Sequence, residues 1–185
     1  METHGRAPTL RSTEPIPATR RRILMFPLPI QGHINPLLQL ASILHTQGFK
    51  ITIIHTEYNS PNHSNYPHFT FKSIQVDFSE VIKQFPNEPA SFYLKMVNDR
   101  CVDPFRNCLA ESLKDEEDPV SCLITDAGLY FTQAVADELK IPRMAFRTSS
   151  LGATVAYGVL IELFEKGYLT FLEKITKHRC RNCHF

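Results

Sequence analysis

Residues 22–55 read RILMFPLPIQGHINPLLQLASILHTQGFKITIIH, and this stretch decides the fold. It opens with an apolar run, Arg22 to Phe26, that prolines and a glycine end, as is typical of a buried strand followed by a loop. Asn35-Pro36 then predicts a helix start, because Asn caps orphan backbone N–H groups and Pro lacks one. Apolar residues at helical spacing follow up to Gly48, the expected left-handed terminal residue, and a second strand is predicted at 49–55.

A strand, a helix and a second strand in one stretch form a βαβ unit. Such crossovers pair their strands in parallel and are almost always right-handed. Further buried strands are predicted at 69–74, 120–125 and 144–146, and helical spacing occurs at 92–97, 104–113, 131–139 and from Ser150 towards Gly167. The predicted fold class is therefore α/β, with a parallel sheet flanked by helices.

The composition excludes several classes of function. A chain of 185 residues fits one well-filled domain or the first part of something longer. Its 20 Lys and Arg against 19 Asp and Glu leave a net charge of +1, which makes no electrostatic case for a nucleic-acid or anionic-membrane partner. No stretch approaches the roughly 18–20 apolar residues of a membrane span. We therefore expect no nucleic acid and no integral membrane segment, and the oligomeric state stays unknown.

Both ends of the chain differ from its middle. Residues 1–20 hold arginines, Ser, Thr and three prolines, and they predict a disordered leader, with a transit peptide as the alternative. Five unevenly spaced cysteines without an apolar signal segment favour a reduced, cytoplasmic location. Residues 171–185 form an atypical basic tail. Its Cys180 and Cys183 have a zinc-ligand spacing, but without a second ligand pair elsewhere we expect an unstructured end and no metal site.

Several other polar residues are expected to have no chemical role. The acidic run 115–118 is interpreted as a solvated surface turn. His45, His55, His63 and His68 are expected to be solvated or packed rather than to act as ligands.

Polar residues follow three of the predicted strands: Gln31-Gly32-His33, then Asp126, then Thr148-Ser149-Ser150. Ligands of open parallel sheets bind beyond the carboxyl ends of the strands, so one cleft can hold all three groups. A histidine there can act as a general base, because imidazole titrates near neutral pH. Asp126, if it reaches the other ring nitrogen, would fix the tautomer. The alternative is that His33 and Asp126 are ordinary packing or capping residues.

The run FPLPIQGHINPLLQLASILHTQGFKITIIHT (26–56) resembles the N-terminal signature of plant UDP-dependent glycosyltransferases, the family 1 enzymes that act on small molecules. SNYPHFTFKSI (64–74) and VSCLITDAGLYFTQAVADELKIPRMAFRTSS (120–150) continue the resemblance, which covers roughly residues 20–170. It is strongest to the branch that glucosylates terpenoids and related secondary metabolites. The resemblance implies that residues 21–170 are the Rossmann-like, acceptor-binding N-terminal domain of a GT-B type enzyme.

The resemblance also implies a reaction and its residues. A sugar, with glucose expected, would pass with inversion from a UDP-sugar to a hydroxyl of a small metabolite such as a terpenoid or flavonoid. His33 would be the general base and Asp126 its orienting partner. Thr148 would touch the sugar of the donor, while Ile30, Gly32, His33 and Ser149 would line the acceptor site. The UDP-sugar is a co-substrate, and no metal or other cofactor is implied.

The matched pattern ends near Tyr168-Leu169, and the chain has no tryptophan, whereas in this family a second domain with a Trp-containing signature holds the donor. Without that domain the donor is not positioned for attack, so we expect this truncated N-terminal half to be inactive alone. The alternative is a non-catalytic protein that binds a small apolar metabolite or a full-length relative. A nicotinamide-dependent oxidoreductase is disfavoured, because G-x-G-x-x-G is missing after the first strand.

Overall fold

The computed structural model describes residues 21–115 and 118–168. The chain divides between Arg147 and Thr148 into two compact units. The first unit carries strands β1 to β5 and helices α1 to α5, and the second carries helix α6 (Leu151–Glu165).

The first unit alternates strands and helices as predicted. In chain order its elements are β1 (Arg22–Phe26), α1 (Gln31–Thr46), β2 (Lys50–Thr56), the 3-10 helix η2 (His63–Asn65), β3 (Thr70–Ile74), α2 (Ser79–Gln84), α3 (Ala90–Arg100), α4 (Val102–Leu113), β4 (Val120–Asp126), α5 (Phe131–Glu138) and β5 (Arg143–Phe146). Every predicted strand is confirmed to within one residue at each end. Helix α2 and η2 were not predicted, because neither is long enough to show a helical period.

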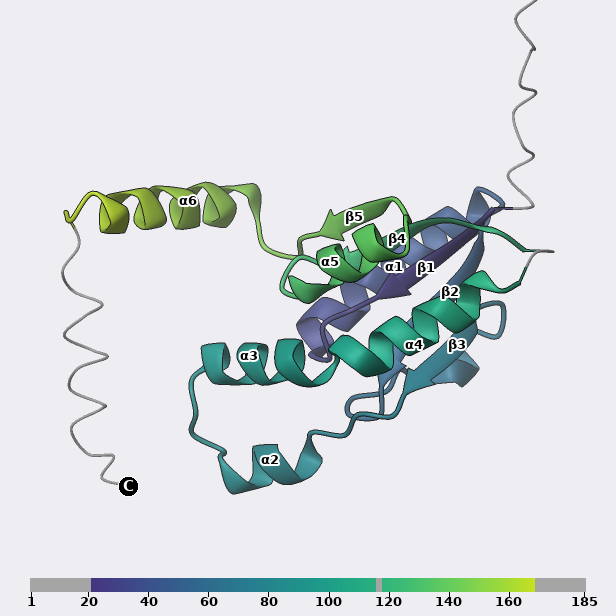
Figure 1. The fold of residues 1–185 in the computed structure, drawn as a ribbon, viewed down its shortest axis with the longest axis horizontal. Helices are drawn as coiled ribbons and strands as arrows, with labels where there is room; N and C mark the ends of the chain where they lie inside the picture. Colours follow the sequence, from purple (N-terminus) through teal and green to yellow (C-terminus); the bar gives the residue numbers. More distant parts are fainter. Residues whose placement is uncertain (1–20, 116–117, 169–185) are drawn as a thin grey trace, which may run out of the picture. The chain divides into compact units, whose positions relative to one another are not determined.

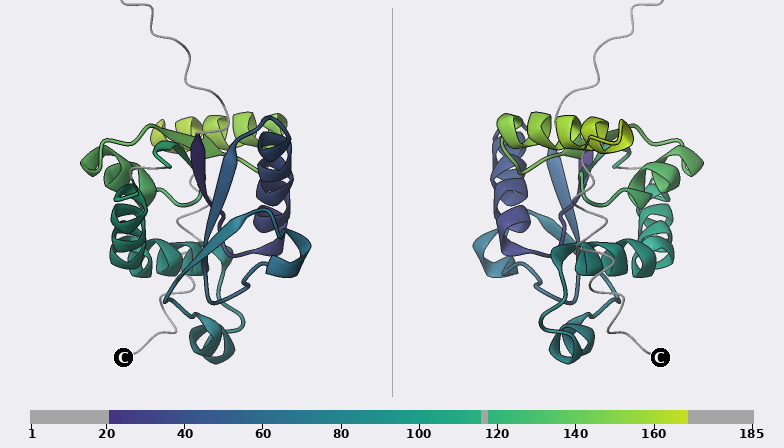
Figure 2. Two further views of the ribbon diagram at one scale, coloured as in Figure 1. Left: turned by 90° about the vertical axis from the view of Figure 1, so that its right-hand side faces the viewer. Right: turned by 90° about the vertical axis from the view of Figure 1, so that its left-hand side faces the viewer.

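The five strands form one parallel sheet in the order β3-β2-β1-β4-β5 (Figure 1). Figure 2 shows α1 on one side of this sheet and α4 with α5 on the other. The predicted α/β class, a parallel sheet flanked by helices, is therefore confirmed. Strand β1 lies in the centre and is buried along its whole length, as expected for a strand covered on both faces.

Alternation along β1 divides the core into two clusters, since successive side chains of a strand point to opposite faces. Leu24 and Phe26 pack on the α4 side, where the ring of Phe26 stacks on Phe105 at 4.9 Å between centroids. Ile23 and Met25 pack on the α1 side. Both clusters are apolar, so the sheet is held between its helix layers mainly by the hydrophobic effect.

Helix α1 begins at Gln31, so the predicted start at Asn35-Pro36 is wrong. The N–H of His33 and the N–H of Ile34 both bond to the carbonyl of Ile30, at 2.8 and 2.9 Å, and close an extra turn upstream. The helix continues through Pro36 although proline cannot donate the usual backbone bond. His33 therefore lies in the first turn of a helix rather than in a loop. At the other end, Gly48 has the predicted left-handed conformation, with φ of 89°.

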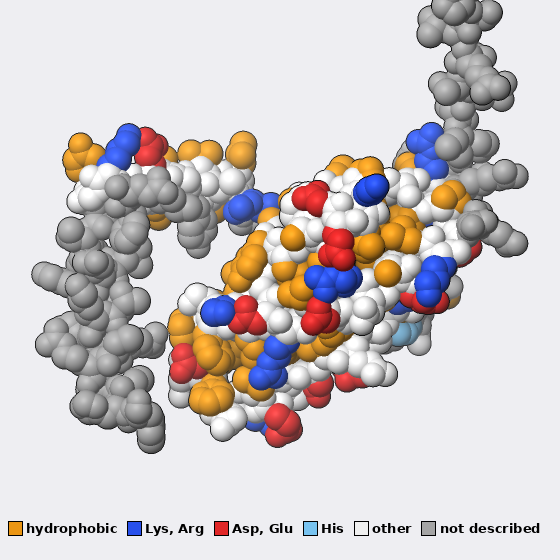
Figure 3. Space-filling view, viewed as in Figure 1, with side chains coloured by type: hydrophobic (Ala, Val, Ile, Leu, Met, Phe, Trp, Pro, Cys, Tyr) orange, Lys and Arg blue, Asp and Glu red, His pale blue; other side chains and the backbone are white. Residues whose placement is uncertain are grey.

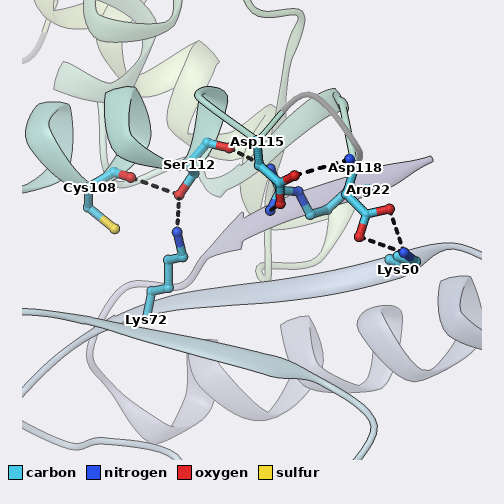
Figure 4. A network of polar contacts seen from close by, with 7 residues as sticks. All are labelled: Arg22, Lys50, Lys72, Cys108, Ser112, Asp115 and Asp118. Carbon is cyan, nitrogen blue, oxygen red and sulfur yellow. Dashed lines mark hydrogen bonds and ion pairs between the residues drawn. The ribbon is translucent and has the colours of Figure 1, made fainter. Parts of the chain in front are cut away.

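The acidic run 115–118 is more than a solvated turn, contrary to expectation. Figure 4 shows Asp118 paired with Lys50 at the start of β2, and Asp115 paired with Arg22 at the start of β1, at 3.3 Å. Sequence spacing could not reveal these pairs, because each joins segments far apart in the chain. They hold Asp115 and Asp118 against the amino ends of two neighbouring strands.

Ser112, near the end of α4, is the centre of the same network (Figure 4). Its hydroxyl donates to the carbonyl of Cys108 at 2.7 Å and accepts from Lys72 of β3 at 2.9 Å. Its carbonyl accepts from the guanidinium of the buried Arg22. The last turn of α4 is thus tied to β1 and β3 by polar contacts.

The four histidines predicted to be solvated or packed do pack against rings. His45 stacks on His68 with centroids 4.4 Å apart, and His63 stacks on Phe71 at 4.1 Å. His55 is buried, and its Nδ1 lies 2.9 Å from the carbonyl of Thr56. Burial, the largest cause, lowers the pKa of His55 below its ordinary value.

Charged side chains of both signs lie close together on the face shown in Figure 3. Among the ion pairs of the described residues, Arg106 pairs with both Asp103 and Glu138. Because charges of both signs are mixed, the described part of this face has no positive electrostatic field that would attract a polyanion. Within residues 21–115 and 118–168, no helix combines the length and the apolar character needed to cross a membrane.

Replacing Phe105 with Ala removes a fully buried ring that contacts Phe26 and also Phe131 of α5. We expect the free energy of unfolding to fall by about 3–5 kcal/mol, measured by urea denaturation with circular dichroism. The control Phe85→Ala removes a ring that is 41% exposed and should cost less than about 1 kcal/mol. Equal losses of unfolding free energy in the two variants would contradict the inference that the buried ring of Phe105 stabilises the core.

Acid should destabilise the fold partly through His55. The unfolded chain protonates this residue near its ordinary pKa of 6.5, whereas the folded chain does so only at lower pH. The unfolded state therefore binds more protons in that window, and stability falls as pH falls from about 7 towards the lowered pKa. Urea midpoints at a series of pH values should show a shallower acid loss for His55→Gln. The control Phe71→Leu disturbs the same packing but should keep the wild-type dependence of the urea midpoint on pH. A wild-type pH dependence in His55→Gln would refute the assignment of the acid loss to His55.

Candidate functional site

The carboxyl ends of β1 and β4 form the topological switch point of the sheet. These two strands are neighbours, but β1 leads through α1 to β2 on one side, and β4 leads through α5 to β5 on the other. Open α/β sheets bind their ligands where two such connections diverge. His33 follows β1 and Asp126 ends β4, so the topology brings both predicted residues to this edge.

His33 and Asp126 are in direct contact. Nδ1 of the imidazole lies 2.7 Å from Oδ2 of the carboxylate. A carboxylate has no proton to give, so Nδ1–H is the donor. The Asp126 side chain is 3% exposed and that of His33 is 32% exposed. A buried acid group therefore holds a partly exposed imidazole in one orientation.

The second oxygen of Asp126 is also engaged. Oδ1 accepts the backbone N–H of Gly128 at 2.8 Å. A Cβ at position 128 would lie 3.2 Å from this oxygen and 3.2 Å from Cδ1 of Leu94, so a larger residue would press on the carboxylate. The close approach of this loop to Asp126 thus favours glycine here.

This arrangement is suited to proton transfer. A proton fixed on Nδ1 makes Nε2 the basic nitrogen of the His33 ring. When Nε2 takes a proton from a bound hydroxyl, the carboxylate of Asp126 stabilises the imidazolium that forms. The pair can therefore serve as a general base with an orienting acid group, which is the chemistry predicted for it.

The other predicted site residues fall into two groups. Ile30 is the N-cap of α1 and is half exposed, and Gly32 lies in the same turn as His33, with open space where a Cβ would be. Both therefore lie within three residues of His33 at the start of α1. Thr148 and Ser149 belong to the second unit, where the Ser149 hydroxyl lies 3.5 Å from that of Thr154. Their contacts with donor and acceptor stay predictions.

Among residues 21–115 and 118–168, no three His, Cys, Asp or Glu side chains lie close enough together to hold a metal ion. His55 and His63 do meet, with their Nε2 atoms 3.3 Å apart, but no third ligand joins them. Cys180 and Cys183 lie outside the described residues, as do the predicted leader 1–20 and tail 171–185.

Two residues near the pair were missed by the sequence analysis. Gly128 could have been noticed as a glycine two positions after an aspartate that ends a strand. Asn98 of α3, buried beside the same loop, carries no local signal, because its partners in that loop, Gly128 and Phe131, lie 30 and 33 residues away in sequence.

Comparison with known proteins now adds to this geometry. No family profile matches the chain. UDP-glycosyltransferase 76B1 of Arabidopsis thaliana is 45% identical over 163 residues, which are 88% of this chain and 34% of that protein. UDP-glycosyltransferase 76G1 of Stevia rebaudiana is 44% identical over 164 residues, covering 85% of this chain and 36% of that protein. The chain spans about a third of the length of these curated relatives.

Solved structures agree on the fold. Apo UGT2 of Phytolacca americana superposes with a TM-score of 0.66 at 19% identity, over 79% of this chain and 33% of that one. Os79 of O. sativa, in complex with U2F and trichothecene, gives 0.62 at 24% identity, over 74% and 31% of the two chains. At such identities the likeness shows the fold alone, and it supports the predicted GT-B type domain. By its sequence relatives and its fold together, the chain is similar to about a third of the length of plant UDP-glycosyltransferases, which confirms the resemblance seen in its sequence.

Proposed function

We propose that this chain supplies the acceptor-binding half and the general base of an inverting glycosyltransferase. The enzyme would move a sugar from a UDP-sugar to a hydroxyl of a small secondary metabolite. The observation that carries the proposal is the 2.7 Å contact between Nδ1 of His33 and Oδ2 of Asp126 at the switch point of the sheet.

Named relatives support glucose and a phenolic acceptor. One Arabidopsis thaliana relative, 35% identical over 147 residues and matched over 32% of its length, is a flavonol 3-O-glucosyltransferase. Phytolacca americana UGT2 has been solved with UDP-2fluoro-glucose and pterostilbene, and it superposes with a TM-score of 0.65. The half-exposed apolar side chain of Ile30 beside His33 suits an apolar acceptor.

The proposed reaction is a single displacement. Nε2 of His33 takes the proton of the acceptor hydroxyl, and the hydroxyl oxygen attacks the anomeric carbon of the sugar. The bond from that carbon to the UDP oxygen breaks on the opposite face, and UDP leaves with the electron pair, so the configuration inverts. Asp126 stabilises the imidazolium while the proton is on His33. A positioned general base contributes about 10²–10⁴ to the rate.

Positioning of the donor needs more than the His33–Asp126 pair. We propose that Thr148 contacts the sugar and that Ser149, Gly32 and Ile30 contact the acceptor. The chain spans about a third of its relatives, and we propose that turnover requires a donor-binding domain in addition to these residues. The enzyme would thus act on two small molecules, the UDP-sugar and the acceptor.

We also propose a reduced, cytoplasmic setting. Cys101, Cys108 and Cys122 are free thiols. Burial raises the pKa of Cys101 to about 12, which keeps its reactive thiolate scarce. Unpaired cysteines in the interior of a domain are usual where thiols stay reduced.

One assay tests the catalytic proposal. The chain is incubated with UDP-glucose and a panel of terpenoid and phenolic acceptors, alone and with the separately expressed donor-binding half of a relative, and glycoside is measured by mass spectrometry. We expect product where both halves are present. His33→Ala should lower the rate by about 10²–10⁴, and Asp126→Asn should lower it by a similar factor, because the amide favours the wrong tautomer.

The matched control is His45→Ala, which removes a partly buried histidine from the same helix, α1, and should leave the rate unchanged. A wild-type rate in His33→Ala would rule out the proposed base. Acceptor binding by calorimetry with no product in any combination would instead support the non-catalytic binding protein.

A further inference from the structure

We infer that Asn98 is a positioning residue for Asp126, which it acts on through the loop that follows β4. The role rests on the proposed function of the His33–Asp126 pair, since it concerns how the carboxylate is held against the imidazole. Asn98 lies on α3, outside the predicted site, and touches neither member of the pair through any contact described above.

Asn98 is buried and uses both ends of its amide. Nδ2 donates to the carbonyl of Leu94, one turn earlier in α3, at 2.9 Å. Nδ2 also donates to the carbonyl of Gly128 at 2.9 Å. Oδ1 accepts the backbone N–H of Phe131, the first residue of α5, over a longer 3.4 Å.

The orientation of this amide follows from its partners. Two carbonyl oxygens can only accept, so the nitrogen must face them, and the N–H of Phe131 requires the oxygen. A flipped amide would set Oδ1 against two carbonyls and leave the N–H of Phe131 without an acceptor. Asn98 therefore hydrogen-bonds to both ends of the segment 128–131, with its side-chain amide in a single orientation.

The segment 128–131 also contacts the carboxylate of Asp126. The peptide of Gly128 bonds through its carbonyl to Asn98 and through its N–H to Oδ1 of Asp126. Oδ2 of Asp126 in turn accepts from His33. A continuous series of hydrogen bonds thus runs from Asn98 to the imidazole, and Gly128 is its central link.

Loss of the amide should loosen the carboxylate rather than only weaken the fold. Without Asn98 the carbonyl of Gly128 loses its side-chain donor, and the loop can move so that its N–H no longer fixes Oδ1. The carboxylate can then turn about its terminal torsion, which is soft for Asp. His33 would lose the partner that keeps its proton on Nδ1, and the Nε2–H form, which neutral imidazole side chains prefer in water, would become populated.

A structural role alone predicts something different. An amide that only ties α3 to α5 would, when removed, lower stability and leave the state of the imidazole unchanged. Ser112 is a matched control, because it is also buried and also makes two side-chain hydrogen bonds, but its partners are Cys108 and Lys72 rather than the loop after β4. Ser112→Ala should cost stability without affecting His33.

The test is the tautomer of His33 in the 185-residue chain, read by NMR from the ring nitrogen shifts and the Nδ1–H proton of ¹⁵N-histidine-labelled protein. His33→Gln identifies the signals. We expect the wild type and Ser112→Ala to show the Nδ1–H form with a strongly downfield proton. Asn98→Ala and Asn98→Leu should lose that proton signal and gain the Nε2–H form, while circular dichroism confirms that each is folded.

Each outcome bears on the inference. A folded Asn98 variant with the wild-type tautomer and proton signal would overturn it, and either variant suffices if the other fails to fold. Loss of the signal in Ser112→Ala as well would also overturn it, by showing a general effect of destabilisation. No UDP-sugar is used, so absence of sugar transfer by a protein that passes this test would count against the proposed function alone. A wild type without the Nδ1–H form would refute the His33–Asp126 contact and both proposals with it.

Discussion

The pairing of β1 with β4 is the interaction on which the rest of the structure depends. It aligns Phe26 with Thr125 in parallel, and so brings the loop after each strand to the same edge of the sheet. His33 and Asp126, 93 positions apart in sequence, meet only because of this register. A slip of one residue would turn Leu24 and its neighbours to the wrong faces, so the two apolar clusters and the polar pair are specified together.

The carboxylates at the two ends of the sheet differ in burial. At the amino end, Asp115 follows α4, is 45% exposed and pairs with Arg22 at the start of β1. This contact joins the residues just after α4 to the start of β1. At the carboxyl end, Asp126 is almost fully buried and both of its oxygens are bonded. Burial removes competing water there, and a single orientation of the carboxylate results.

The sequence predicts those parts of this structure that short apolar runs determine. The buried strand Arg22–Phe26 is predictable because its residues from Ile23 to Phe26 are all apolar. Gly48 is predictable because glycine readily adopts the left-handed conformation at the end of a helix. The start of α1 was misplaced because its first turn depends on the carbonyl of Ile30, a backbone group with no sequence signal. The pairs of the run 115–118 and the contacts of Asn98 depend on chain segments that only the finished fold brings together. The candidate base and its acid partner were predictable from strand ends and resemblance, but the support around them was not.

Rigid elements carry the pair itself. His33 lies in the first turn of α1 and Asp126 is the last residue of β4, so neither needs a bound ligand to reach the other. Solved structures with 19% and 24% identity to this chain retain its fold, which shows that the sheet survives replacement of most side chains. A site built on backbone positions of that sheet can therefore persist while the loops around it change. Fold likeness alone would not assign a reaction. The proposed sugar transfer therefore depends on the atoms at the switch point, where the buried carboxylate of Asp126 contacts Nδ1 of His33.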